Sequence, residues 1–361
     1  PEIRVDIQDL EEHEVRDVND DPDVENIAAA DVPLNLIAPL AGEAGDPDAP
    51  PWGLEAIGAL TSPWTGQGIR VAVLDTGIML DHPAFRHLLA RQRIVVRNFT
   101  NGAPNDVSDQ NHDGHGTHCA GTIAGGSVGG RRIGVAPDIA CLIVGKVLGE
   151  GGDNNETIVE AINWAVAEKA DIISMSLGIN FPRMVESLNK EKGMPLQAAT
   201  SLALQQYRDT IKLYAKLADF LSERNVLLVA ATGNDSRRPA YTIDVMPPAA
   251  SELIIKVGAV GRTPRGALSI APFSNTGADL VAPGADIVSA GLDGGLHSLS
   301  GTSMATPHVA GIAALWAQKG RADNGHLYFP DLKYDLMGSL QRLPGARADI
   351  GRGMAMAPQL S

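Results

Sequence analysis

Short apolar segments alternate with segments of helical periodicity along most of the chain, and this alternation limits the fold more than any other feature. Parallel strands need crossover connections, and helices in those connections cover both faces of the sheet. We therefore predict an α/β fold, a three-layer αβα architecture with a mainly parallel central sheet. Strands are predicted at residues 69–74, 139–148, 172–177, 226–231, 253–260, 280–282 and 287–290, and helices from about residues 115, 156, 200 and 303.

Residues 1–40 precede this pattern and form a small α+β segment with little core of its own. Residues 3–7 alternate apolar and polar side chains, residues 11–19 suit a polar helix, and residues 24–37 return as extended chain. A stretch rich in Gly, Asp, Ala and Pro then marks a linker. The predicted division is an N-terminal extension with its linker at 1–45 and a main domain at 50–361.

Ser303 follows Gly301 and Thr302 at the start of a predicted helix that is rich in Ala and Gly. Pro307 is tolerated in the first turns of a helix, which favours a helix start near Ser303. The positive end of the helix dipole then points at the serine hydroxyl, where developing negative charge is stabilised. In isolation, Gly-Thr-Ser would be read as an ordinary helix N-cap.

Three more polar residues stand at strand ends or at a helix start: Asp75, His115 and Asn234. A serine hydroxyl becomes a good nucleophile when an imidazole takes its proton, and a carboxylate orients that imidazole. Asn234 and the backbone N–H of Ser303 can then stabilise an oxyanion. Each residue alone has a structural alternative, as a turn or cap residue. Their chain order, Asp then His then Ser inside glycine-rich segments, makes coincidence implausible.

Five motifs resemble the subtilisin-like serine proteases, or subtilases, from about Trp52 to the end of the chain. They are Val73-Leu74-Asp75-Thr76-Gly77-Ile78, His115-Gly116-Thr117-His118-Cys119-Ala120-Gly121, Ser176-Leu177-Gly178, Ala231-Thr232-Gly233-Asn234 and the segment Gly301–Gly311. The resemblance implies a subtilisin-like fold and a serine endopeptidase that hydrolyses peptide bonds through an acyl-enzyme on Ser303. It implies Asp75 as orienting acid, His115 as general base and acid, and Asn234 as oxyanion donor.

Cys119 directly follows His118 in the second motif. With a cysteine at this position, the motif looks like the branch of the family that includes proteinase K and thermitase. In that branch a free thiol lies beneath the catalytic histidine, so the resemblance implies sensitivity to mercurials. The chain has two cysteines, Cys119 and Cys141, and no disulfide framework is expected.

Residues 1–40 look like the second half of a subtilase propeptide. The resemblance implies a segment that covers the active site and feeds its C-terminal end into the cleft, as in a zymogen. An inhibitory remnant and a permanent extension both stay open, with a processing point expected between Leu40 and Pro51.

Two glycine-rich edges resemble the subtilase strands that sandwich an extended peptide or unfolded protein substrate. They comprise Gly149, Glu150, Gly151 and Gly152 on one side and Ser176, Leu177 and Gly178 on the other. Glu150 and Asp153 give the hypothesis of a preference for Lys or Arg upstream, with simple solvent-exposed acids as the alternative. Residues 180–200 are extra relative to a minimal subtilase. We expect a lengthened helix with a surface loop; a lid or partner site is the alternative.

No cofactor is expected for catalysis. The family's tight calcium site is expected to be missing, because Ala84 and residues 126–129 stand at its ligand positions. A weak calcium site near Asp106, Asp109 and Asp113 stays open, although an EF-hand fails because Ala120 replaces its last ligand. Zinc on the neighbouring histidines is not expected, since no His-Glu-x-x-His pattern occurs.

A net charge of -14 argues against nucleic acid or an anionic membrane as the main partner. No apolar run approaches the about 20 residues that span a bilayer, and the first residues do not read as a signal peptide. Extracytoplasmic location is weakly favoured by the resemblance alone. Two other functions compete with peptide hydrolysis: transpeptidation, supported by the extra segment, and an inactive binding protein, opposed by the complete set of catalytic residues.

Overall fold

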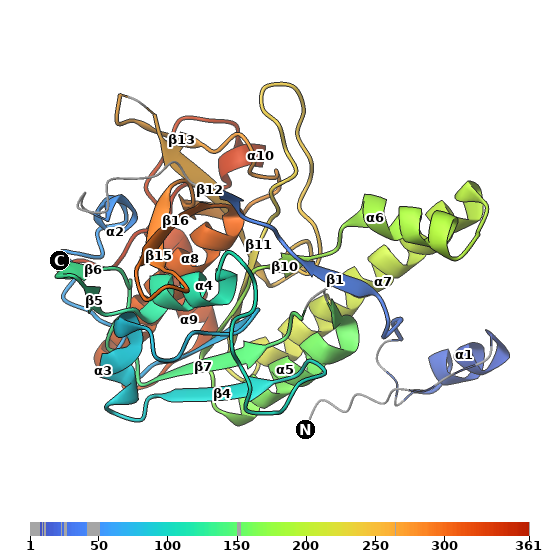
Figure 1. Cartoon of the computed structure of the whole chain (residues 1–361), viewed down its shortest axis with the longest axis horizontal. Coiled ribbons are helices and arrows are strands. Elements are labelled where there is room, and N and C mark those ends of the chain that lie inside the picture. The colour runs from blue at the N-terminus through green and yellow to red at the C-terminus, as the bar shows by residue number, and fades with distance from the viewer. Residues whose placement is uncertain are drawn as a thin grey trace.

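A computed structural model of the chain describes residues 8, 10, 12–22, 24, 27–41, 51–149, 153–263 and 265–360. An eight-stranded sheet runs through its centre in the order β13-β12-β11-β9-β3-β7-β4, with β14 paired to β12 (Figure 1). Every pair in it is parallel except β12 with β13. The strands are β3 (Arg70–Asp75), β4 (Ile94–Asn98), β7 (Cys141–Lys146), β9 (Ile172–Met175), β11 (Leu227–Ala231), β12 (Ile255–Arg262), β13 (Leu268–Ile270) and β14 (Leu280–Pro283).

Helices cover both faces of this sheet, and β3 shows the sequence reason. Its side chains alternate between two cores, because successive residues of a strand point to opposite faces. Val71 and Val73 belong to the core beneath α4 (His115–Ala124) and α8 (Thr302–Asn324). Ala72 and Leu74 belong to the core on the opposite face. That core lies beneath α5 (Asn155–Ala167) and α7 (Leu196–Ser222). The predicted three-layer αβα architecture is confirmed.

Smaller elements complete the described part of the chain. They are η1 (Pro83–Phe85), α3 (Arg86–Leu89), β5 (Ser127–Val128), β6 (Arg131–Arg132), β15 (Ile287–Ala290), β16 (Leu296–Ser300), α9 (Phe329–Gly338) and α10 (Arg347–Ile350). Two strands of the central sheet, β4 and β13, were not predicted. Both are half-buried; charged Arg97 lies inside β4, and β13 has three residues. They therefore lack the continuous apolar run that identified the other central strands.

Residues 180–200 form more helix than the sequence predicted. α6 (Phe181–Glu186) leads into a π-helical turn, η2 (Ser187–Glu191), and α7 then begins at Leu196. Asn180 caps α6 because its side chain accepts a hydrogen bond from Arg183 N at 3.0 Å. Pro195 lies immediately before α7. These elements form an arm that projects from the sheet, to the right in Figure 1. The prediction for this segment was a lengthened helix with a surface loop.

The N-terminal segment contains α1 (Glu12–Asn19), β1 (Pro33–Leu36) and β2 (Leu40–Ala41). The predicted polar helix and extended chain are therefore present, whereas residues 3–7 and the linker at 42–50 lie outside the described residues. We call residues 33–41 the strap. β1 pairs antiparallel with β10 (Leu177–Gly178) and with β8 (Asp153–Asn154), and β2 pairs with β16. The strap thus joins the two sides of one cleft.

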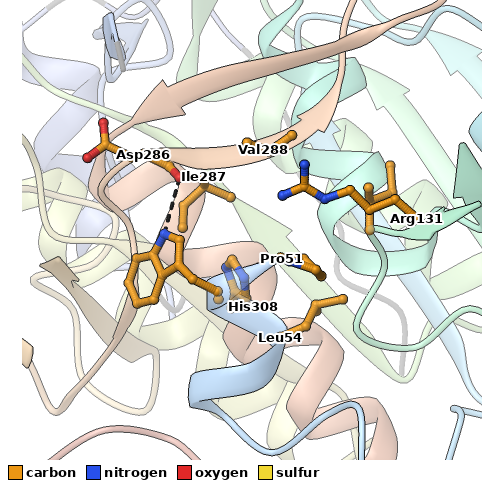
Figure 2. Close-up of a pocket in the computed structure, with 10 residues that line it drawn as sticks. Pro51, Leu54, Arg131, Asp286, Ile287, Val288 and His308 are labelled. Atoms are coloured by element: carbon orange, nitrogen blue, oxygen red, sulfur yellow. Dashed lines mark hydrogen bonds between the residues drawn. The ribbon is translucent and has the colours of Figure 1, made fainter. Parts of the chain in front are cut away.

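The first described element after the strap is α2 (Trp52–Ala56), which packs against β14. Trp52 Nε1 donates to Ala285 O at 3.2 Å and to Asp286 O at 3.1 Å. Figure 2 shows the second of these hydrogen bonds as a dashed line. Beside it is a cavity of about 20 Å³ lined by Arg131 and His308. That volume holds about one water molecule, so this cavity is a packing feature, not a substrate site.

Candidate active site

Asp75 ends β3 and His115 begins α4, and both side chains are buried. Nδ1 of His115 lies 2.7 Å from Oδ1 of Asp75. A Cβ atom on Gly116 would lie 2.3 Å from Gly77 O, so only glycine allows the helix to approach the strand end this closely. The predicted acid, Asp75, and the predicted base, His115, are therefore brought together. The Nε2 atom of His115 lies on the side of the ring that faces away from Asp75.

Asp109 fixes this junction from behind. Its carboxylate accepts hydrogen bonds from Thr76 Oγ1 at 2.9 Å and from both N and Oγ1 of Thr117 at 2.8 Å. Thr76 Oγ1 in turn accepts from Gly116 N at 2.9 Å. From the sequence, Asp109 is predicted only as a possible calcium ligand, and its positioning role is missed. An acid within a polar loop gives no sequence signal that it will be buried among these donors.

The charge balance around His115 favours the imidazolium. Burial would lower the pKa of His115, but the Asp75 carboxylate opposes burial and raises the pKa well above the ordinary value of 6.5. His118 behaves differently, because burial lowers its pKa to about 3. Its Nε2 lies 2.9 Å from Ile287 O, within the core. His118 is therefore a neutral structural residue, while His115 is the titrating group of the site.

Ser303 lies in the first turn of α8 and is fully buried. Asn234 follows β11, and its Oδ1 accepts hydrogen bonds from Thr302 N and Thr302 Oγ1, both at 2.9 Å. These two bonds turn the Nδ2 group of Asn234 toward the cleft, where it donates to Ala38 O at 3.0 Å. A fixed amide donor therefore lies beside the serine, as an oxyanion site requires.

The strap occupies the site. Ser303 Oγ donates to Ile37 O at 3.2 Å, whereas Asn234 Nδ2 donates to the next carbonyl, that of Ala38. Nε2 of His115 is buried without a hydrogen-bond partner among the described residues. The serine and the amide donor thus contact different carbonyls, and the serine is not hydrogen-bonded to the histidine.

One predicted substrate edge pairs with the strap, and the other is described in part. Asn35 lies opposite Gly178 and Leu36 opposite Leu177, while Ile37 N donates to Ser176 O at 3.4 Å. Gly178 has no room for a larger residue, because a Cβ atom there would lie 2.4 Å from Sδ of Met246.

On the facing edge, Gly149 lines a cavity beside the strap. Its continuation, Glu150, Gly151 and Gly152, lies outside the described residues. The next described pair is Asp153 opposite Leu34. Oδ1 of Asp153 accepts from Thr157 Oγ1 at 2.5 Å, so this carboxylate already has a partner within the protein.

The acidic residues considered for calcium have other partners. Asp106 accepts two hydrogen bonds from Ser108, and these lower the pKa of Asp106. Asp113 lies 3.1 Å from His112 Nε2. Within the described ranges, one group of three metal-ligand side chains converges, and it is Asp75, His115 and Cys119. That group is the catalytic pair with the thiol beneath it, and Cys119 Sγ donates to Ser303 O at 3.3 Å.

Comparisons with known proteins agree with this geometry. A family model described as the subtilase family matches residues 66–334. The major intracellular serine protease of Bacillus subtilis (strain 168) is 39% identical over 256 residues, which cover 69% of this chain and 68% of that protein. The intracellular serine protease of Paenibacillus polymyxa is 36% identical over 262 residues, 71% of this chain and 69% of that protein.

A third relative extends the match further along the chain. Subtilisin of Bacillus sp. (strain TA39) is 30% identical over 342 residues, which cover 88% of this chain and 73% of that protein. Among the described helices, none combines the length and the apolar character needed to cross a membrane.

Proposed function

Because the chain belongs to the subtilase family and is a serine endopeptidase, we propose that Asp75, His115, Ser303 and Asn234 carry its chemistry. The observation that carries the proposal is the 2.7 Å contact between Asp75 and His115, beside a serine at a helix start. The oriented amide of Asn234 adds the oxyanion donor. Catalysis of this type needs no cofactor.

In the proposed mechanism, Nε2 of His115 takes the proton of Ser303 as Oγ attacks the substrate carbonyl carbon. Asp75 stabilises the imidazolium that forms. The oxyanion accepts hydrogen bonds from Asn234 Nδ2 and from Ser303 N–H at the positive end of α8. His115 then gives the proton to the leaving amine, and water, activated by the same histidine, releases the acyl group from Ser303.

We propose further that residues 1–45 are a propeptide-like extension of the catalytic domain at 50–361, and that the strap keeps the enzyme inactive. For attack to succeed, the nucleophile and the oxyanion donor must contact the same carbonyl group. In the strap, Ser303 Oγ contacts the carbonyl of Ile37, whereas Asn234 Nδ2 contacts the carbonyl of Ala38. The strap therefore occupies the cleft as a peptide would, but in a register that does not support cleavage.

The proposed substrate is an extended peptide or an unfolded protein. The strap supports this choice, because its backbone pairs with both edges of the cleft, as a bound peptide strand would. Extracytoplasmic location, which the resemblance favoured, competes with the intracellular location in the names of two relatives. Cell fractionation with an antibody against the chain decides between them.

A weak calcium site near Asp106, Asp109 and Asp113 stays a separate proposal. Its support is the acidic composition of this loop. A rise in Tm on adding calcium that is lost in Asp113→Asn would support it. Equal Tm values with calcium and with chelator would contradict it.

Hydrolysis of unfolded casein tests the proposed function. The full chain should release peptides slowly, through the molecules whose strap has left the cleft, and Ser303→Ala should release none while keeping the Tm of the parent. Peptide release by Ser303→Ala at the parental rate would contradict the proposal.

A further inference from the structure

A cavity of about 430 Å³ lies beside the strap, one residue upstream of the carbonyl that contacts Ser303. Leu36 of the strap forms one wall, and Leu148, which follows β7, forms another. Thr76, the neighbour of Asp75, also lines it. The cavity is therefore connected to the catalytic cleft and faces the substrate residue that would take the place of Leu36.

The charged side chains that line this cavity are basic. Lys146 and Arg183 contribute two permanent positive charges, and none of the described lining residues is acidic. The whole chain has a net charge of -14, so a cavity with only basic charges differs from the general character of the protein. Fixed cations in a partly enclosed cavity attract a carboxylate more strongly than they would in open water.

Lys146 ends β7 and is almost fully buried. Its Nζ donates to Ser108 O at 2.8 Å and to Gln110 Oε1 at 3.1 Å, both neutral acceptors. An ammonium group has three N–H donors, so one remains for a ligand. The positive charge of Lys146 helps to lower the pKa of Asp106, but the Asp106 carboxylate is hydrogen-bonded to Ser108 and not to Lys146.

Arg183 belongs to α6, in the arm that the sequence analysis identified as extra. It is exposed, and its positive charge helps to lower the pKa of Glu186 on the same helix. Glu186, one turn further along, is 2.5 Å from Lys190 Nζ and is thereby paired. The guanidinium is consequently available to a ligand that enters the cavity from the cleft.

Leu34 and Leu36 point to one side of the strap, because alternate residues of a strand share a face. Both pack in the core cluster that contains Leu148. A glutamate in place of Leu36 would lay its methylene groups on the same apolar surface and extend its carboxylate into the cavity. The glutamate side chain is long enough for its methylene groups to pack near Leu148 while its carboxylate approaches Lys146 and Arg183.

We propose that this cavity selects an acidic side chain, glutamate above all, at the substrate residue immediately before the cleaved one, and that Arg183 determines this specificity. The inference rests on the proposed function, since it names the substrate class of the same cleft. It also gives the inserted arm a role, which is to bring a cation to the substrate. It differs from the upstream preference for Lys or Arg that Glu150 and Asp153 suggested.

Peptides that differ at one residue test the inference with the full chain. Each peptide carries Glu, Gln or Leu at one of four positions upstream of the cleaved bond, and products are identified by mass. We expect kcat/KM for Glu to exceed that for Gln by about fivefold at the residue before the cleaved one, and by less elsewhere. Because the ratio is taken within one enzyme, the fraction of molecules blocked by the strap cancels.

Two variants separate the role of Arg183 from a general charge effect. Arg183→Gln should reduce the Glu to Gln ratio to about twofold, because Lys146 still faces the cavity, while the rate for the Gln peptide stays at the parental value. Arg208→Gln removes an exposed charge from α7 outside the cavity and should keep the parental ratio.

Equal cleavage of the Glu and Gln peptides by the parent would overturn the inference while leaving the proposed function intact. An equal loss of preference in both variants would overturn the role of Arg183. Failure to cleave any peptide would instead contradict the proposed function, and the inference with it.

Discussion

Asn234 shows at the scale of one residue how the fold prepares a catalytic group. Its Oδ1 has two donors from Thr302, so the amide cannot turn over without losing both hydrogen bonds. The Nδ2 group is thereby held toward the cleft before any substrate arrives. A donor that is oriented in advance needs no reorganisation in the transition state, which is why it contributes to rate and not to substrate binding.

Replacing this donor should therefore change kcat. We expect Asn234→Ala to lower kcat by about 10² to 10³ with KM nearly unchanged, because the oxyanion loses one donor. Steady-state kinetics on a chromogenic peptide gives both parameters. A rise in KM with unchanged kcat would mean that Asn234 binds substrate and does not stabilise the oxyanion.

His115 sets the expected dependence on pH. The general base must be neutral, and its pKa is raised above 6.5, so activity should fall as pH drops through a value above 6.5. The same shift stabilises the folded state below pH 6.5, and this contribution is lost as pH rises through the raised pKa. In Asp75→Asn the acid limb of kcat/KM should move to lower pH. An acid limb with a midpoint below 6 in the parent would contradict this.

Cys119 predicts sensitivity to mercury. Its Sγ lies 3.8 Å from Nδ1 of His115, so a mercurial on the thiol would displace the imidazole. p-Chloromercuribenzoate should inactivate the parent and spare Cys119→Ala. Cys141 is also buried but begins β7 away from the catalytic pair, so Cys141→Ala should be inactivated like the parent. Protection by Cys141→Ala in place of Cys119→Ala would contradict the assignment.

At the scale of single residues, the sequence predicts the catalytic side chains, because acyl transfer needs an acid, a base and a nucleophile of known residue types. Asp75, His115 and Ser303 lie in glycine-rich motifs at strand ends and helix starts, so their types and contexts are both visible. Asp109 could not be found this way, because its role depends on donors from two segments that only the fold brings together.

The strap is held in the cleft by side-chain burial as well as by strand pairing. Leu34 is fully buried in the core beneath α5 and α7, although it precedes the linker. Pro33, its neighbour, is exposed. The strap is thus fixed by an apolar side chain as well as by the pairing of its backbone.

Loosening the strap should activate the enzyme. Leu34→Ala removes buried methyl groups, a change that usually costs about 2–5 kcal/mol where the site cannot collapse. Much of that cost should fall on strap binding, so peptidase activity should rise. Pro33→Ala, on the exposed side, should leave activity at the parental value. A fall in Tm without any gain in activity would mean that Leu34 supports the domain and not the blocked state.

At this scale the sequence predicts central strands and long helices well, because apolar runs and helical periodicity identify them. It misses β4, whose residues are half-buried and include Arg97, and the short, half-buried β13. For residues 180–200 it predicts a lengthened helix with a surface loop and does not identify α6 and η2, which are too short to display a helical period. Predicting the strap as extended chain was correct, but its register in the cleft follows from contacts with β10 and β8.

The whole molecule combines a preformed catalytic site with a segment of the same chain that occupies it. The sheet delivers Asp75 and Asn234 at the carboxyl ends of β3 and β11, and two helix starts deliver His115 and Ser303. Neighbouring segments of the chain then decide what reaches the serine. The strap occupies the cleft, and Arg183 of the inserted arm lines the cavity beside it. Sequence reasoning predicts the catalytic fold as a whole but cannot show which carbonyl each group contacts.

Labelling with a fluorophosphonate tests the central claim most directly, because the reagent reacts with a serine that a histidine has activated. After incubation of the parent and of Leu34→Ala, peptide mapping should find the label on Ser303 in both proteins, faster in Leu34→Ala. Ser303→Ala and His115→Ala should take up no label. Absence of label from Leu34→Ala, or a label on another residue of the folded protein, would contradict the assignment of Ser303 as the nucleophile.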